Sequence, residues 1–208
     1  SGTFYSVAYG MVNGVGTYVA VGGNDSTTFT STSNHVFSNS LNHVYTSTNG
    51  STSISRSPGT PSAFRAVVFN MGVFTAVGYD GASYRSPDGV NWSVIESGAH
   101  TDIVALRVID GRYYALQRTL GSFVSEVVNA VLVSSDGVNW ARVEQNTTIN
   151  QFALERFNGR LYTAGGGASI LRSEPIPSVA APVLAVLTPN TLAKLGDTVA
   201  LAVASNGD

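Results

Sequence analysis

The chain has 208 residues, of which 43% are hydrophobic and only 12% are charged, and it contains 22 glycines, no cysteine and a formal net charge of -2. The low charge excludes a coiled coil, and the lack of cysteine excludes a disulfide scaffold and any thiolate metal site. The slightly acidic balance argues against an electrostatic nucleic-acid binder. No segment approaches the roughly 18 apolar residues of a membrane-spanning helix, so we expect no membrane span.

Four similar units follow one another along the chain, and each begins with two apolar runs joined by a glycine-containing turn. Asn-Gly and Asp-Gly turns between apolar, β-branched runs are the strongest local signal for a β-hairpin, because both turn residues need a positive φ. Each unit therefore starts with a predicted hairpin, and the four turns lie at Asn13-Gly14, Asn70-Met71-Gly72, Asp110-Gly111 and Asn158-Gly159.

A second motif closes each unit. Residues 86–92 and 134–140 both read Ser-x-Asp-Gly-Val-Asn-Trp, and degenerate copies begin at Ser47 and Ser173, which gives spacings of 39, 48 and 39 residues. A period of about 40 residues with four short strands is the signature of a β-propeller blade. We therefore predict an all-β chain, a β-propeller of about four four-stranded blades near residues 4–57, 64–97, 102–145 and 149–174.

The closing motif resembles the Asp-box (BNR) repeat of sialidase-like propellers, with one residue fewer between Asp and Gly. We expect it to form the turn between the third and fourth strands, where Asp accepts backbone N–H groups, Gly supplies a positive φ and Trp packs between blades. A sugar or cation site at the two aspartates is the alternative, but a motif that recurs in every blade favours a structural role. The structural residues are Ser86, Asp88, Gly89, Trp92, Ser134, Asp136, Gly137 and Trp140.

The connection between the second and third strands varies most from unit to unit, and it is long in residues 22–42 and 117–129. Insertions in repeat proteins tend to lie on one face, which is often the binding face. Two histidines in the first long loop could ligate a metal, but no third ligand is near them, so we expect no metal and no cofactor. The binding-face candidates are His35, Phe37, His43, Tyr79, Asp80, His100, Arg118, Phe123 and Glu126.

The resemblance to sialidase-like enzymes implies an arginine cluster, a Tyr–Glu nucleophile pair and an acidic Asp. The arginines of this chain largely occupy repeat-related positions, and the Arg-Ile-Pro motif of the family is missing. Catalytic propellers of the family need about six blades, whereas this chain supplies about four. We therefore expect no catalytic residues. The favoured function is a non-catalytic extracellular module that binds a glycan or a surface protein. The alternatives are a filament-forming or adhesin component assembled by strand exchange, and a fragment of a glycoside hydrolase.

The composition changes after the fourth unit. Residues 175–182 read as a Pro/Ala linker. Residues 183–208, which include Leu195-Gly196-Asp197-Thr198-Val199, resemble the first strands of an immunoglobulin-like domain of bacterial surface proteins. This segment is either a partial domain or a pair of docking strands through which the chain self-associates, and the four blades either close with its help or belong to a larger ring. An extracellular or cell-surface location follows from the resemblance.

Overall fold

The structure is a computed structural model that describes residues 3–23, 28–29, 35–36, 42–56, 63–81, 83–95, 102–118, 129–144 and 151–173. The chain divides into two units, Ser1–Ser178 and Val179–Asp208. Every described residue belongs to the first unit. The expected Pro/Ala linker and immunoglobulin-like segment lie outside the described residues and stay predictions.

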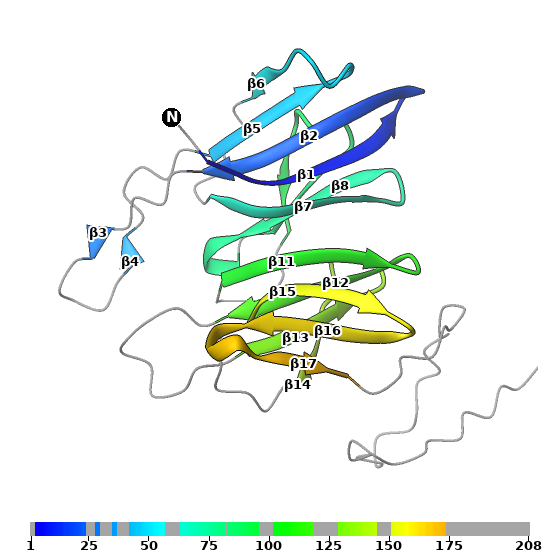
Figure 1. Cartoon of the computed structure of the whole chain (residues 1–208). Coiled ribbons are helices and arrows are strands. Elements are labelled where there is room, and N and C mark those ends of the chain that lie inside the picture. Colours follow the sequence, from blue (N-terminus) through cyan, green and yellow to red (C-terminus); the bar gives the residue numbers. More distant parts are fainter. Residues whose placement is uncertain are drawn as a thin grey trace, which may run out of the picture. The chain divides into compact units, whose positions relative to one another are not determined.

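The first unit consists of consecutive antiparallel sheets, one for each sequence repeat, and we call these sheets blades 1 to 4 (Figure 1). Blade 1 contains β1 (Thr3–Val12), β2 (Val15–Gly23), β5 (Asn42–Ser47) and β6 (Ile54–Arg56), with a small ribbon of β3 (Thr28–Phe29) and β4 (His35–Val36) between β2 and β5. Blade 2 contains β7 (Phe64–Asn70), β8 (Val73–Gly78), β9 (Ser83–Ser86) and β10 (Ser93–Val94).

Blade 3 contains β11 (Asp102–Ile109), β12 (Arg112–Arg118), β13 (Asn129–Ser134) and β14 (Ala141–Glu144), and blade 4 contains β15 (Gln151–Phe157), β16 (Arg160–Gly165) and β17 (Ile170–Arg172). The all-β architecture and its division into blades are confirmed. The fourth blade differs from the expectation of four strands, since three strands form within residues 151–173, just before the sequence motif breaks off into Pro175-Ile176-Pro177.

The hairpin between the first two strands of each blade has the geometry that its turn residues demand. Both central residues have a positive φ in every case, for example 49° and 79° at Asn13 and Gly14 and 50° and 79° at Met71 and Gly72. Two successive residues with positive φ make the type I′ turn, whose twist matches that of the flanking strands. The same pattern recurs at Asp110-Gly111 and Asn158-Gly159.

Successive blades pack face to face, and the core lies between them. Each blade has a leading face, which points toward the preceding blade, and a trailing face, which points toward the next one. At the first junction, Phe64, Val67 and Phe74 on the leading face of blade 2 pack with Val19 and Val21 of blade 1. The next two junctions are built alike, from clusters that contain Ile103, Leu106, Ala66 and Val77, and then Leu154, Leu161, Ala105 and Leu116. Strands buried on both faces have little room for charge, which accounts for the 12% of charged residues.

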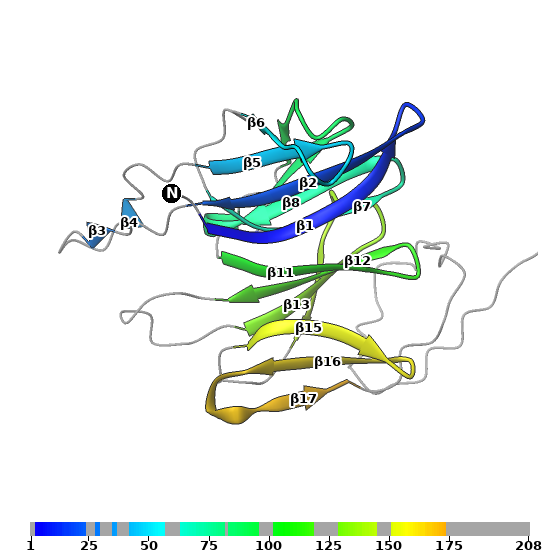
Figure 2. The ribbon, with the colours of Figure 1, turned by 45° about the horizontal axis from the view of Figure 1, so that its top comes forward.

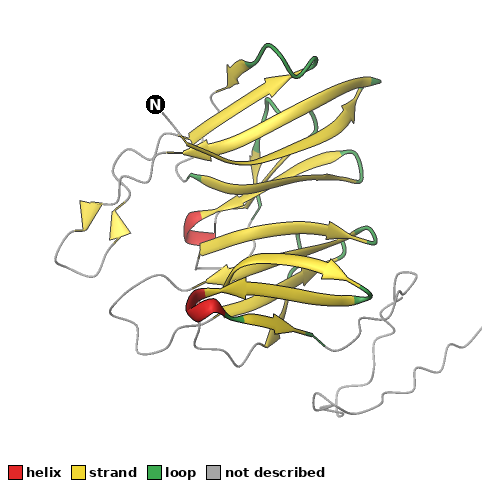
Figure 3. Cartoon of the chain, in the orientation of Figure 1, coloured by secondary structure: helices red, strands yellow, loops and turns green. Residues whose placement is uncertain are grey.

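The blades follow one another in chain order from β1 to β17, as Figure 2 shows. Among the described residues, the extensive contacts between sheets join only consecutive blades. The stack has two different ends, which can be seen in Figure 3. The hairpin turns lie at one end, which we call the turn end, and the 3-10 helices η1 (Tyr79–Gly81) and η2 (Gly166–Ala168) lie at the other, which we call the loop end. The part of the chain that the structure describes holds no helix long and apolar enough to cross a membrane.

Candidate binding site

The first strand of every blade carries a β-bulge at the same place near the loop end. The pairing register shifts after Phe4, Phe64, Ile103 and Gln151, so that one extra residue stands in each strand. A bulge leaves its extra residue unpaired and re-aims the side chain. The four residues brought into equivalent positions in this way are Tyr5, Arg65, Val104 and Phe152.

Glycine on the neighbouring strand accommodates the bulge. A Cβ placed on Gly78 would lie 2.0 Å from the carbonyl oxygen of Ala63, and one on Gly22 would lie 1.9 Å from that of Thr3. Both distances are far below van der Waals contact, so no other residue fits these positions without a backbone shift. The repeat sequence therefore specifies the bulge in blades 1 and 2 through a glycine on the second strand.

Two of the extra residues meet across the junction of blades 1 and 2. The guanidinium carbon of Arg65 lies 4.3 Å from the ring centroid of Tyr5 and 4.5 Å from that of Tyr79, so the cation stands between two aromatic rings. Arg65 also donates a hydrogen bond to the hydroxyl of Tyr79, whose ring is buried. Cation–π contacts of this kind stabilise a guanidinium away from bulk water.

A similar arrangement joins blades 3 and 4. The guanidinium carbon of Arg118, at the end of β12, lies 5.0 Å from the ring centroid of Phe152, and Arg118 pairs across the ladder with the buried Asp102. Burial lowers the pKa of Arg118, the carboxylate of Asp102 opposes this effect, and the positive charge of Arg65 adds to it. The two arginines therefore act on each other electrostatically.

We call the set Tyr5, Arg65, Tyr79, Asp102, Arg118 and Phe152 the arginine row. It draws on all four blades and holds two guanidinium groups against one carboxylate. A guanidinium offers a planar fork of donors that matches a carboxylate, and Arg118 Nε is buried with no hydrogen-bond partner among the described residues. An anionic group bound here would relieve the repulsion between the two arginines, so the arginine row is suited to an acidic ligand.

Of the residues expected on the binding face, Tyr79 and Arg118 belong to the arginine row, while His43 lies half-buried in β5 opposite Gly22. His35 lies in β4 and Asp80 in η1, and their side chains fall outside the described part of the structure. Phe37, His100, Phe123 and Glu126 lie outside the described residues and stay predictions. Four residues of the arginine row were not predicted from the sequence, namely Tyr5, Arg65, Asp102 and Phe152. Tyr5, Arg65 and Phe152 share only the place of the extra residue in the first strand of their blades, and Asp102 begins the first strand of blade 3.

The two intact closing motifs, which we call the serine–aspartate turns, link the third and fourth strands of blades 2 and 3. Oδ1 of Asp88 accepts the backbone N–H groups of Val90 and Asn91 at 2.8 Å each, and Gly89 N donates to the Ser86 hydroxyl at 2.8 Å. Asp136 receives the equivalent bonds at the same distances. Burial raises the pKa of each aspartate, but the hydrogen bonds outweigh it and lower the pKa of Asp88 to about 2 and that of Asp136 still further.

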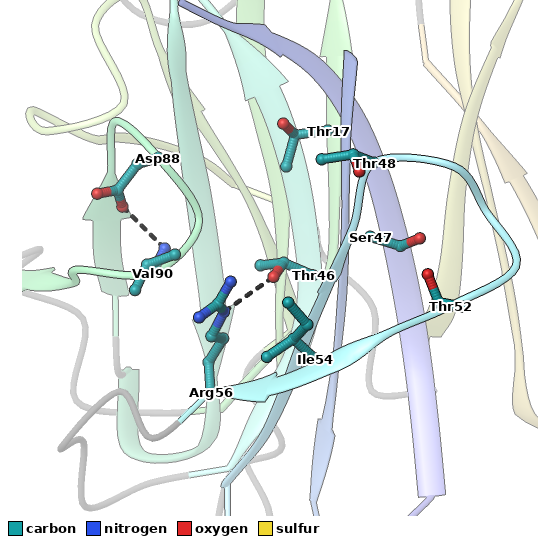
Figure 4. A pocket seen from close by; sticks show the side chains of 9 residues that line it. All are labelled: Thr17, Thr46, Ser47, Thr48, Thr52, Ile54, Arg56, Asp88 and Val90. Carbon is teal, nitrogen blue, oxygen red and sulfur yellow. Dashed lines mark hydrogen bonds between the residues drawn. The ribbon is translucent and has the colours of Figure 1, made fainter. Parts of the chain in front are cut away.

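A groove of about 230 Å³ opens beside the first of these turns, between blades 1 and 2 (Figure 4). Its walls carry mostly hydroxyl side chains, among them Thr17, Thr46 and Ser47, together with the charged groups of Arg56 and Asp88. Arg56 Nε donates to the Thr46 hydroxyl at 2.9 Å, which fixes the guanidinium against β5. The groove offers several hydroxyl groups and one cation at the turn end.

Comparisons with known proteins support the fold. No protein-family profile and no curated protein sequence matches the chain. A solved structure titled "YCF48 bound to D1 peptide" is similar over 84% of this chain, with a TM-score of 0.54 and 20% sequence identity. The match covers 52% of that chain, so the chain spans about half the length of the solved structure. Together with the consecutive antiparallel sheets, this likeness shows that the chain has a β-propeller fold.

Proposed function

We propose that the chain is a non-catalytic binding module whose loop end receives an acidic segment of a partner protein. The observation that carries this proposal is the pair of stacked guanidinium groups, Arg65 between Tyr5 and Tyr79 and Arg118 against Phe152. Their aromatic neighbours offer apolar surface beside the charge, and Phe152 is 50% exposed. Aromatic residues and arginine are the residue types that dominate binding energy at protein interfaces. The similar solved structure, YCF48, was determined with a bound D1 peptide, which favours a peptide over other acidic ligands.

The test measures binding of labelled oligo-glutamate, oligo-lysine and oligo-(Gly-Ser) peptides by fluorescence anisotropy. We expect only the glutamate peptide to bind, with an affinity that falls as salt is raised. Arg65→Ala or Arg118→Ala should weaken binding by about tenfold or more, since a charge-assisted hydrogen bond contributes about 1.5–3 kcal/mol. Arg65→Lys should restore only part of the affinity, because lysine keeps the charge but lacks the planar fork.

The control is Arg142→Ala, which removes an exposed arginine on β14 away from the arginine row. It changes the net charge by the same amount as Arg65→Ala and should leave binding unchanged. Equal effects of the two variants, or equal binding of all three peptides, would overturn the proposal. Circular dichroism spectra and melting curves of each variant show whether the fold is kept.

A second candidate function is glycan binding in the groove of Figure 4, favoured by its hydroxyl side chains and by Arg56. A glycan array with the unmodified chain and with Arg56→Ala separates it from peptide binding. Glycan signals that are lost in Arg56→Ala but kept in Arg65→Ala would support the groove. An array on which the unmodified chain binds no glycan would rule out the second candidate and keep acidic-peptide binding as the proposed function.

We also propose that the serine–aspartate turns are Asp-box elements with a structural role and that the module works outside the cell or at its surface. The first part is supported by the use of Asp88 Oδ1 and Asp136 Oδ1 within their own turns. The location is supported by the sequence resemblance of residues 183–208. The alternative function is that of a structural component of a filament or adhesin. This alternative predicts that the arginine row binds no soluble ligand.

A further inference from the structure

The leading face of blade 1 is apolar and exposed. Phe4, Val7, Tyr9 and Tyr18 are 50%, 64%, 53% and 41% exposed. Ser6 lies on the opposite side of β1, and its hydroxyl accepts the N–H of Val67 in blade 2 at 3.2 Å. The face that carries Val7 and Tyr9 therefore points away from blade 2. Isolated exposed apolar residues are common, but a contiguous face of large ones indicates an interaction surface.

This exposed face repeats the chemistry of the leading face of blade 2. The register pairs Tyr9 with Tyr18 in blade 1 and Phe69 with Phe74 in blade 2. The ring centroids of these two pairs are 4.8 Å and 4.7 Å apart. Phe4 and Val7 correspond to Phe64 and Val67 by the same register.

The agreement extends to the third strand. Phe4 meets Tyr45 edge-on at 5.2 Å, and Phe64 meets Tyr84 edge-on at 5.4 Å. In blade 2, Phe64 and Val67 are 0% and 3% exposed because the trailing face of blade 1 covers them. The leading face of blade 1 therefore has the side chains that a propeller blade buries against the trailing face of another blade.

Blade 4 exposes the complementary surface. Ala153 pairs with Ala164 across β15 and β16, at the place where Ala66 pairs with Val77 and Ala105 with Leu116. The next blade covers those two equivalent pairs, whereas both alanines of blade 4 are exposed and Ile170 beside them is 73% exposed. Among the described residues, blades 1 and 4 thus present one uncovered leading face and one uncovered trailing face.

We propose that a second copy of the chain covers both faces, with the leading face of blade 1 in each copy packed on the trailing face of blade 4 in the other. Each junction inside the chain buries one leading face on one trailing face, so two copies joined through both pairs of uncovered faces would form one closed ring. A head-to-tail contact of this kind closes when the rotation between copies completes a circle, and here two equal junctions would do so. The proposal is independent of the ligand of the arginine row.

Sedimentation equilibrium and light scattering on the full 208-residue chain test the proposal. The unmodified chain should have twice the mass of one copy. Val7→Asp on the leading face and Ala164→Arg on the trailing face should each give a monomer, because either charge lies in both junctions. The matched control is Val94→Asp, which places the same charge at a 67% exposed valine on β10 and should leave the dimer intact.

Mixing the two monomeric variants gives the sharpest outcome. One junction then joins two unmodified faces, and the other brings the aspartate introduced by Val7→Asp beside the arginine introduced by Ala164→Arg, so the dimer should return. A dimer that Val7→Asp disrupts but Ala164→Arg does not would point to like faces pairing and would overturn the proposal. An unmodified chain that stays monomeric at micromolar concentration, or that forms open-ended oligomers, would overturn it as well. Tyr9→Asp provides a second leading-face variant if Val7→Asp does not fold.

Discussion

The Ser86 hydroxyl donates a hydrogen bond of 2.9 Å to Oδ1 of Asp88, and the same bond joins Ser134 to Asp136 at the same length. In blade 1 an amide takes the place of the carboxylate. Asn49 Oδ1 accepts the N–H groups of Ser51 and Thr52 at 2.9 Å each. The turn therefore needs an acceptor oxygen at this position and tolerates the loss of its charge.

Replacement of Asp88 by Ala should destabilise the protein by about 2 kcal/mol, because two backbone N–H groups lose a charged acceptor. In a domain of this size such a loss lowers the melting temperature by about 4–8 °C. Asp88→Asn keeps an acceptor oxygen, like the Asn49 turn of blade 1, and should destabilise the protein about half as much as Asp88→Ala. Thermal melts of the three proteins measure the difference, and equal melting temperatures for Asp88→Ala and the unmodified chain would contradict the role of this turn.

Stability should fall in acid because of these aspartates. An unfolded Asp has a pKa of about 3.9, whereas the hydrogen bonds of the turn lower the pKa of Asp88 to about 2 in the folded state. A lowered pKa contributes stability that is fully present above the unfolded value and is lost as the pH falls toward the folded one. The free energy of unfolding, measured by urea titration at a series of pH values, should therefore decline between about pH 4 and pH 2. Asp88→Asn should flatten part of that decline, and an unchanged slope would contradict the assignment.

Two glycines with the same backbone conformation should respond differently to alanine. Gly72 has φ 79° and nothing within 4 Å of the position that a Cβ would take, so Gly72→Ala meets only backbone strain of about 1–2 kcal/mol. Gly89 has φ 76°, and its Cβ would lie 2.5 Å from Val19 Cγ2 of blade 1. Gly89→Ala should cost about 1–3 kcal/mol more, because it adds a clash inside a packed junction. Denaturant unfolding of the two variants checks this order, and equal losses of stability would contradict the packing of Gly89 against Val19.

The blades were predictable from sequence because their signals are local. A hairpin turn such as Asn158-Gly159 and a turn such as Ser86–Trp92 each fix the backbone within a few residues, and their spacing gives the repeat. Blade 4 departs from the expected four strands where this local signal ends, because three strands form within residues 151–173 and the closing motif is degenerate from Ser173 onward. Local chemistry repeated at a fixed period thus carries most of the fold.

The arginine row could not be predicted in the same way. Arg65 meets Tyr5 across a junction between blades, far apart in the sequence, and the glycine that accommodates each bulge does not show which side chain of another blade the extra residue will meet. Tyr79 and Arg118 were expected at the end that carries the long loops, and the structure places Tyr79 in η1 at the loop end and Arg118 at the end of β12. The residues that complete the site depend on packing between blades, which no single repeat encodes.

Met71 occupies a turn position that the other three blades give to Asn or Asp. Its φ is 50°, close to the 47° of Asn158, and its side chain is 66% exposed. Asn adopts this left-handed conformation at lower cost than an unbranched apolar residue, because its short side chain can bond to the local backbone. Met71→Asn should therefore stabilise the protein by about 0.5–1 kcal/mol, in the range of other substitutions that fit the backbone better. The reverse change, Asn158→Met, should destabilise blade 4 by a similar amount, and urea unfolding of both variants measures the two effects; a loss of stability in Met71→Asn would show that the Met71 side chain has a packing role.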